Sequence, residues 1–148
     1  MSSLNDKVCD FWEKEACGTS SSVVKENKKF SKDYFEAIEK SRYSYEPFIH
    51  SIAQFSRHKG KKVLEIGVGA GTDHLQWARV GTELYGLDLT EKAISTTQKR
   101  LNLYGEKSNL IIHDAESLPF ENNKFDIVYS WGVIHHSEHP EKIFKEIL

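Results

Sequence analysis

From residue 62 onward, short apolar runs alternate with segments in which apolar residues recur at helical spacing. Four short apolar runs bounded by turn residues predict buried strands: residues 62–66, 84–87, 110–112 and 126–130. The segments between and after them carry apolar positions at helical spacing: residues 72–80, the stretch from the N-cap Thr90 to about 101, and a last helix that begins near Pro140. Strands that alternate with helices predict a parallel sheet covered on both faces.

The residues before Tyr45 have a different pattern. Two short amphipathic patches, around Trp12 and around Phe35, flank a basic stretch over residues 25–32 that we interpret as a solvated linker. We therefore divide the chain into an N-terminal helical appendage, residues 1–44, and a core, residues 45–148. The appendage is either a lid over a site on the sheet or an extra helical layer, and a helix over residues 45–59 is expected to lead into the core.

Composition narrows the class of protein. A chain of 148 residues suits one domain, and 20 basic and 22 acidic residues are spread evenly along it, which lowers the expectation of a nucleic-acid or anionic-membrane partner. The two cysteines, Cys9 and Cys17, have no metal-ligand spacing, so a reducing, cytoplasmic setting and no metal site are expected. The sequence contains neither a signal-peptide pattern nor an apolar run of about 18 residues.

Glycines stand at alternate positions directly after the first predicted strand. Gly67, Gly69 and Gly71 let the chain turn tightly and let a ligand lie against the backbone. A dinucleotide-binding loop would place its third glycine at position 72, and the carboxylate of Glu65 would repel a pyrophosphate. The same carboxylate favours a ligand that carries an ammonium and a sulfonium group.

Two aspartates end the second and third predicted strands. Asp88 is placed to accept hydrogen bonds from both hydroxyls of a ribose, although it can also cap the helix after Thr90. Asp114 is placed to accept a hydrogen bond from the exocyclic amine of adenine. Together the two strand ends predict an adenosine site.

These motifs together resemble, in order and spacing, the S-adenosylmethionine-dependent methyltransferases with a Rossmann-like fold, and the variant is similar to the ubiquinone/menaquinone-biosynthesis type. The resemblance covers about residues 45–148. It implies a doubly wound α/β sheet in the order 3-2-1-4, with the glycine loop beside the methionine part of S-adenosylmethionine. It also implies the following cofactor-binding residues: Glu65, Gly67, Val68, Gly69, Gly71, Asp88, Leu89, Asp114, Ala115, Glu116, Ser130, Trp131 and Gly132.

The loop after the fourth strand lies at the same edge of the predicted sheet. It lacks the motifs of the amino-methylating and cytosine-methylating DNA enzymes of this fold, which favours a small-molecule acceptor with an oxygen or carbon nucleophile. His135 and His136 are the candidate catalytic bases, because histidine titrates near neutral pH, while packing or helix capping is the alternative role for at least one of them.

The final helix places Ile143, Phe144, Ile147 and Leu148 on one side and stops without a cap. Because the family continues with further strands, we expect a catalytic domain that lacks its C-terminal part. Two other classes stay open: a cofactor-binding module without activity, and a nicotinamide-dependent oxidoreductase, which the glycine spacing disfavours.

Overall fold

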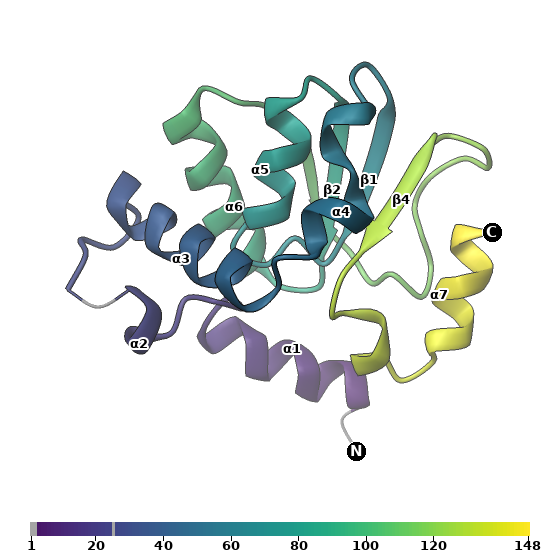
Figure 1. Cartoon of the computed structure of the whole chain (residues 1–148). Coiled ribbons are helices and arrows are strands. Elements are labelled where there is room, and N and C mark those ends of the chain that lie inside the picture. Colours follow the sequence, from purple (N-terminus) through teal and green to yellow (C-terminus); the bar gives the residue numbers. More distant parts are fainter. Residues whose placement is uncertain (1–2, 25) are drawn as a thin grey trace.

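A computed structural model describes residues 3–24 and 26–148, and a four-stranded parallel sheet forms its centre (Figure 1). The strands lie in the order β3-β2-β1-β4, as predicted. Their bounds agree with the predicted runs to within one residue at each end: β1 Lys62–Ile66, β2 Glu83–Asp88, β3 Asn109–Ile112 and β4 Ile127–Ser130. The Rossmann-like fold class is confirmed.

The helices between and after the strands also match the pattern: α5 Thr72–Arg79, α6 Glu91–Tyr104 and α7 Pro140–Ile147. The hydroxyl of Thr90 accepts a hydrogen bond from the Ala93 amide at 3.2 Å, which caps the start of α6 as expected. Helix α6 ends at Gly105, whose φ of +71° is a conformation that favours glycine.

Apolar side chains cover both faces of the sheet. Val63 on β1 packs with Leu75 and Trp77 of α5 on one face, while Leu64 and its neighbours pack with α7 on the other. Successive side chains of a strand point to opposite faces. The alternation along β1 therefore places Glu65 on the α5 face, although it is a carboxylate in a core position.

The N-terminal residues form three helices: α1 Leu4–Lys14, α2 Ser21–Val24 and α3 Lys32–Tyr45. Helix α3 lies beside α5, and its Phe35 and Ile38 form a small core with α2 and Ala70. Helix α1 has no buried residue and crosses the carboxyl ends of the strands (Figure 1). Helix α3 thus adds a helical layer beside α5, whereas α1 lies across the strand ends, where a lid is expected. Residues 26–31 form neither helix nor strand, and Lys25 of the predicted linker lies outside the described residues.

The predicted single helix over residues 45–59 is wrong. Helix α3 ends at Tyr45, a short helix α4 spans Ile49–Ala53, and a 3₁₀ turn, η1, spans Phe55–Arg57. Pro47 lacks an N–H group and disfavours helical backbone at the residue before it, and Gln54 takes a φ of +49° that closes α4. Within the described residues, no helix has the length and apolar character needed to cross a membrane.

Candidate functional site

A cavity of about 350 Å³ opens at the carboxyl ends of the strands. It lies where the strand order reverses, between β1 and β4, which is the usual binding position in open α/β sheets. Side chains from α1, α3 and the loops after all four strands line it, so residues from both ends of the chain share one space.

Buried side chains of α6 hold the glycine loop, residues 67–71, through hydrogen bonds to its carbonyl oxygens. The Thr97 hydroxyl donates a hydrogen bond to the Gly69 carbonyl oxygen at 3.1 Å. The guanidinium of Arg100, which is fully buried, donates to the Ala70 carbonyl oxygen at 3.2 Å and pairs with Glu39 of α3 at 2.9 Å. The loop is therefore fixed to α6 and α3 before any ligand arrives.

Asp88 both lines the cavity and organises the loops around it. One carboxylate oxygen accepts a hydrogen bond from the Gly69 amide at 3.1 Å, and the other accepts from the amide and hydroxyl of Thr90 at 3.0 and 2.9 Å. Burial raises the pKa of Asp88, and these hydrogen bonds oppose the shift. Asp88 thus bonds to Thr90, the N-cap residue of α6, but the cap itself is made by Thr90, whose hydroxyl accepts from the Ala93 amide.

Asn5 of α1 joins this helix to the loop after β3 and to the loop before α7. Its amide nitrogen donates to Asp114 at 2.9 Å and to Glu116 at 2.8 Å, and its amide oxygen accepts from the Glu138 amide at 2.9 Å. Glu116 also accepts a hydrogen bond from the Ser137 hydroxyl, and chiefly this bond lowers its pKa to about 2. The Glu116 carboxylate therefore ties α1 to the loop that precedes α7.

A further carboxylate at the cavity, Asp73 at the start of α5, was not predicted. It is 4% exposed and accepts hydrogen bonds from Arg42 at 3.0 Å, Tyr43 at 2.9 Å and Tyr129 at 2.9 Å. Burial by itself would lower the pKa of Arg42, but the charge and hydrogen bond of Asp73, together with the charge of Glu46, raise the Arg42 pKa above its ordinary value. Arg42 also lines the cavity and pairs with Glu46, so its guanidinium is held in place between two carboxylates at the cavity wall.

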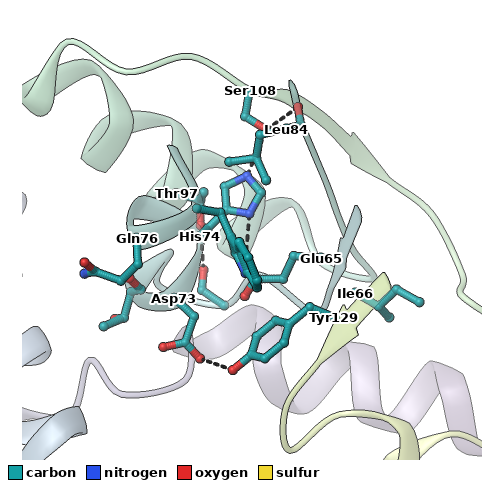
Figure 2. A network of polar contacts seen from close by, with 12 residues as sticks. Glu65, Ile66, Asp73, His74, Gln76, Leu84, Thr97, Ser108 and Tyr129 are labelled. Carbon is teal, nitrogen blue, oxygen red and sulfur yellow. Dashed lines mark hydrogen bonds and ion pairs between the residues drawn. The ribbon is translucent and has the colours of Figure 1, made fainter. Parts of the chain in front are cut away.

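Glu65 faces the core as well as the cavity. Its carboxyl oxygen lies 2.9 Å from Nδ1 of the buried His74, and Nε2 of that ring lies 2.8 Å from the Ser108 hydroxyl (Figure 2). Burial and then the charge of Asp73 raise the pKa of Glu65 well above its usual range. Glu65 therefore lines the cavity as predicted, but one of its oxygens already has a partner in the core.

Aromatic residues form the other end of the cavity. Trp12 of α1 stands edge-on to His136 with ring centroids 6.1 Å apart, and the indole N–H of Trp131 donates to Glu46 at 2.9 Å. Partial burial and then the neighbouring His135 lower the pKa of His136. A neutral imidazole therefore lines this end of the cavity at neutral pH.

Eleven of the residues predicted from the sequence line this cavity: Glu65, Gly67, Val68, Gly69, Asp88, Leu89, Asp114, Ala115, Trp131, Gly132 and His136. Four predicted residues do not: Gly71, Glu116, Ser130 and His135. Gly71 is packed against Thr97, and the Ser130 hydroxyl donates to the Ile66 carbonyl oxygen at 3.2 Å. The sequence interpretation did not include Asn5, Trp12, Arg42 and Asp73 among the site residues. The place of the first three at the cavity depends on how α1 and α3 pack, whereas Asp73 follows the glycine loop directly.

The chain is similar to known methyltransferases in sequence and structure. It is 31% identical over 115 residues to the phthiotriol/phenolphthiotriol dimycocerosates methyltransferase of Mycobacterium leprae, covering 76% of this chain and 42% of that protein. It is 34% identical over 108 residues to phosphoethanolamine N-methyltransferase 2 of Caenorhabditis elegans, covering 70% of this chain and 24% of that one. The chain thus spans less than half the length of these two relatives.

The fold comparison extends over nearly the whole chain. The magnesium protoporphyrin IX methyltransferase of Synechocystis PCC 6803, solved with bound SAM, superposes with a TM-score of 0.71 at 16% identity, covering 99% of this chain and 71% of that one. The family model described as a methyltransferase domain matches residues 64–148. This chain therefore belongs to the methyltransferase domain family.

Proposed function

We propose that this chain binds S-adenosylmethionine in the cavity and transfers its methyl group to a small-molecule acceptor. One observation carries the proposal: the glycine loop and Asp88 share a single cavity with Trp131 and His136. A nucleoside-bearing methyl donor and an acceptor can therefore meet in one space that α1 covers.

The cavity residues fit this cofactor. Gly69 lines the cavity with a φ of +53°, a backbone conformation that favours glycine, so a ligand can lie directly against the loop backbone. We assign Asp88 to the ribose hydroxyls, Asp114 with Ala115 to the adenine, and Arg42 to the cofactor's carboxylate. When bound, S-adenosylmethionine supplies an electrophilic methyl group on a positively charged sulfur.

The residues at the other end of the cavity act on the acceptor. Neutral His136 accepts a proton from an acceptor hydroxyl or carbon acid, while His135, which lies outside the cavity, holds the neighbouring ring at a centroid distance of 3.9 Å. Trp12 and Trp131 exclude water from the reacting groups. In this proposal residues 1–44 act as the lid and layer, and residues 45–148 act as the catalytic core.

The lining of the cavity suggests the acceptor class. Apolar side chains from the N-terminal helices face the space: Val8, Trp12, Ala16, Val23 and Ile38. We infer a small acceptor with an apolar part and an oxygen or carbon nucleophile, and no nucleic acid, since charge is spread evenly along the chain. The free cysteines, Cys9 and Cys17, suit the reducing cytoplasm, where we place the reaction.

Titration calorimetry tests the proposal directly. S-adenosylmethionine should bind the chain and NAD should not; binding of NAD alone would favour the oxidoreductase. Transfer of a labelled methyl group to a panel of fatty acids and phenols then separates an enzyme from a module that only binds the cofactor. Binding without transfer to any acceptor would support the module.

A further inference from the structure

A chain of hydrogen bonds crosses the core between the cavity and the loop before β3. The Glu65 carboxyl lies 2.9 Å from His74 Nδ1, His74 Nε2 lies 2.8 Å from the Ser108 hydroxyl, and that hydroxyl donates to the Leu84 carbonyl oxygen at 3.0 Å (Figure 2). His74 is fully buried and Glu65 is 4% exposed. The chain thus buries an acid beside a base, next to the cavity that Glu65 lines.

The core is shaped around the imidazole ring. A Cβ added to Gly86 of β2 would stand 2.6 Å from His74 Cε1, a distance that real side chains do not show. Only glycine therefore leaves room for the ring beside β2. The ring position, and with it the direction of both nitrogens, is fixed by packing.

Counting donors assigns the protons. A carbonyl oxygen only accepts, so the single hydroxyl proton of Ser108 is used on Leu84, and His74 Nε2 must then carry the proton that it donates to Ser108. One further proton is needed between His74 Nδ1 and Glu65, because two bare lone pairs at 2.9 Å would repel. The Glu65–His74 pair therefore holds this proton jointly and has no net charge.

The directions of the two pKa shifts assign the shared proton to Glu65. Burial, with the charge of Asp73 second, raises the pKa of Glu65 well above its usual range, and burial lowers the pKa of His74 to about 3. Glu65 is then a neutral acid that donates to a neutral ring. A neutral acid offers little attraction to a cation.

This leads to an inference that rests on the proposed function. We infer that His74 is a positioning residue that takes the Glu65 proton when the ammonium group of S-adenosylmethionine enters the cavity, so that Glu65 becomes a carboxylate facing the cation. The O–H bond on Glu65 breaks and an N–H bond forms on His74 Nδ1, while Nε2 keeps its proton on Ser108. No proton is exchanged with solvent.

The charges around the pair are consistent with this transfer. The carboxylates of Asp73 on α5 and Asp88 on β2 disfavour ionisation of Glu65, while Arg42 of α3 favours it. The phenol of Tyr129 on β4 also faces this region, but it stays protonated because burial and the nearby Asp73 raise its pKa. An added ammonium group tips this balance toward the ionised acid.

Nitrogen-15 NMR of the histidine rings tests the inference on the chain itself. Without ligand, His74 should show a protonated Nε2 and an unprotonated Nδ1, and saturation with S-adenosylmethionine or S-adenosylhomocysteine should protonate both nitrogens. Methylthioadenosine, which lacks the amino-acid part, should leave the ring unchanged. A protonated Nδ1 with a bare Nε2 in the empty chain overturns the proton assignment, and bound S-adenosylmethionine without a change at His74 overturns the transfer.

Two variants separate the transfer from a structural role. His74→Phe and Glu65→Gln should each weaken binding of S-adenosylmethionine and S-adenosylhomocysteine by roughly 10- to 100-fold, the range for hydrogen bonds to a charged group, and leave methylthioadenosine binding unchanged. His58→Phe, which replaces a histidine that packs on Trp77 outside the cavity, is the control. Equal weakening of all three ligands would indicate a structural role and overturn the inference.

The same titrations distinguish failure of the proposed function from failure of the proton transfer. If the unmodified chain binds neither S-adenosylmethionine nor S-adenosylhomocysteine, the proposed function fails and the transfer step fails with it. If both bind but only S-adenosylmethionine is weakened in the variants, the cation that Glu65 faces is the sulfonium, and the ammonium assignment is overturned.

Discussion

The two halves of the cavity are built in different ways. The glycine-loop half, Gly67–Gly71 with Asp88, is held by buried side chains such as Arg100 and Thr97. The α1 half, formed by Asn5, Trp12 and His136, has no buried α1 residue and is joined to the core by hydrogen bonds near the surface. Buried contacts are lost only when the core opens, whereas surface contacts open locally at little cost. The first half is therefore set by the fold, and we expect the second to open locally.

The largest expected effect is in the glycine-loop half. Gly67 has a φ of +81°, and an added Cβ would stand 2.2 Å from the Val133 side chain. Gly67→Ala should lower the free energy of unfolding by roughly 2 to 5 kcal/mol, the sum of a left-handed backbone and an overpacked core, and abolish S-adenosylmethionine binding. Urea unfolding and calorimetry measure the two effects.

Gly105→Ala is the matched control for that variant. Gly105 has a φ of +71° but no atom within 4 Å of the added Cβ, so only the backbone cost of roughly 1 to 2 kcal/mol should appear. Equal losses in both variants would show that the contact with Val133 does not set the loop.

The next effect concerns the base in the α1 half. His136→Gln should lower methyl transfer by at least about 10²-fold without changing S-adenosylmethionine affinity, because a general base contributes at least this much. The corresponding change at His135, outside the cavity, should have a small effect. Partial burial and His135 lower the pKa of His136 below its ordinary value of 6.5. As the pH increases, the rate of methyl transfer by the unmodified chain should therefore increase at pH values below 6.5 and stay constant above 6.5. A rate that is unchanged in His136→Gln would remove the residue from the mechanism.

A smaller loss is expected at the second strand end. Asp88→Ala removes the acceptor for the Gly69 amide and for the ribose, and should weaken S-adenosylmethionine binding by roughly 1.5 to 3 kcal/mol with the fold intact by circular dichroism. Asp33→Ala, an exposed carboxylate on α3, serves as the control. Unchanged affinity in folded Asp88→Ala would refute the ribose assignment.

The smallest effect concerns the attachment of α1. Asn5→Ala removes hydrogen bonds to Asp114 and Glu116 near the surface and should cost about 1 kcal/mol. Hydrogen exchange of the α1 amides should speed up about 5-fold while that of α5 stays unchanged, with Lys7→Ala as the control. Equal acceleration in both helices would mean that α1 does not open separately.

Acid should release the same attachment. The pKa of Glu116 is lowered to about 2, chiefly by the Ser137 hydroxyl, from an ordinary value of 4.5. A lowered folded-state pKa stabilises the attachment above the unfolded value, and this contribution is lost as the pH falls from about 4.5 through 2. Exchange of the α1 amides, corrected for the intrinsic rate, should therefore increase across this range. Constant protection of α1 down to pH 2 would contradict the role of Glu116.

The glycine-loop half was largely predictable because its signals are local. The strand ending at Ile66, the glycines after it and Asp88 at the next strand end lie within one β-α-β unit, where backbone geometry follows directly from residue type. The single helix predicted over residues 45–59 was wrong, because the spacing of apolar residues does not show that the helix is interrupted at Pro47 and Gln54.

The sequence by itself determined the order of the elements, the parallel sheet and the place of a ligand loop. Hydrophobic periodicity and glycine are properties of neighbouring residues, so they can be interpreted without contacts. Only the tertiary structure decided that Arg42 meets Asp73, that Asn5 reaches Glu116, and that His74 occupies the space left by Gly86. Each of these contacts joins separate elements of the fold, and no periodicity along the chain encodes which side chains meet when helices and strands pack.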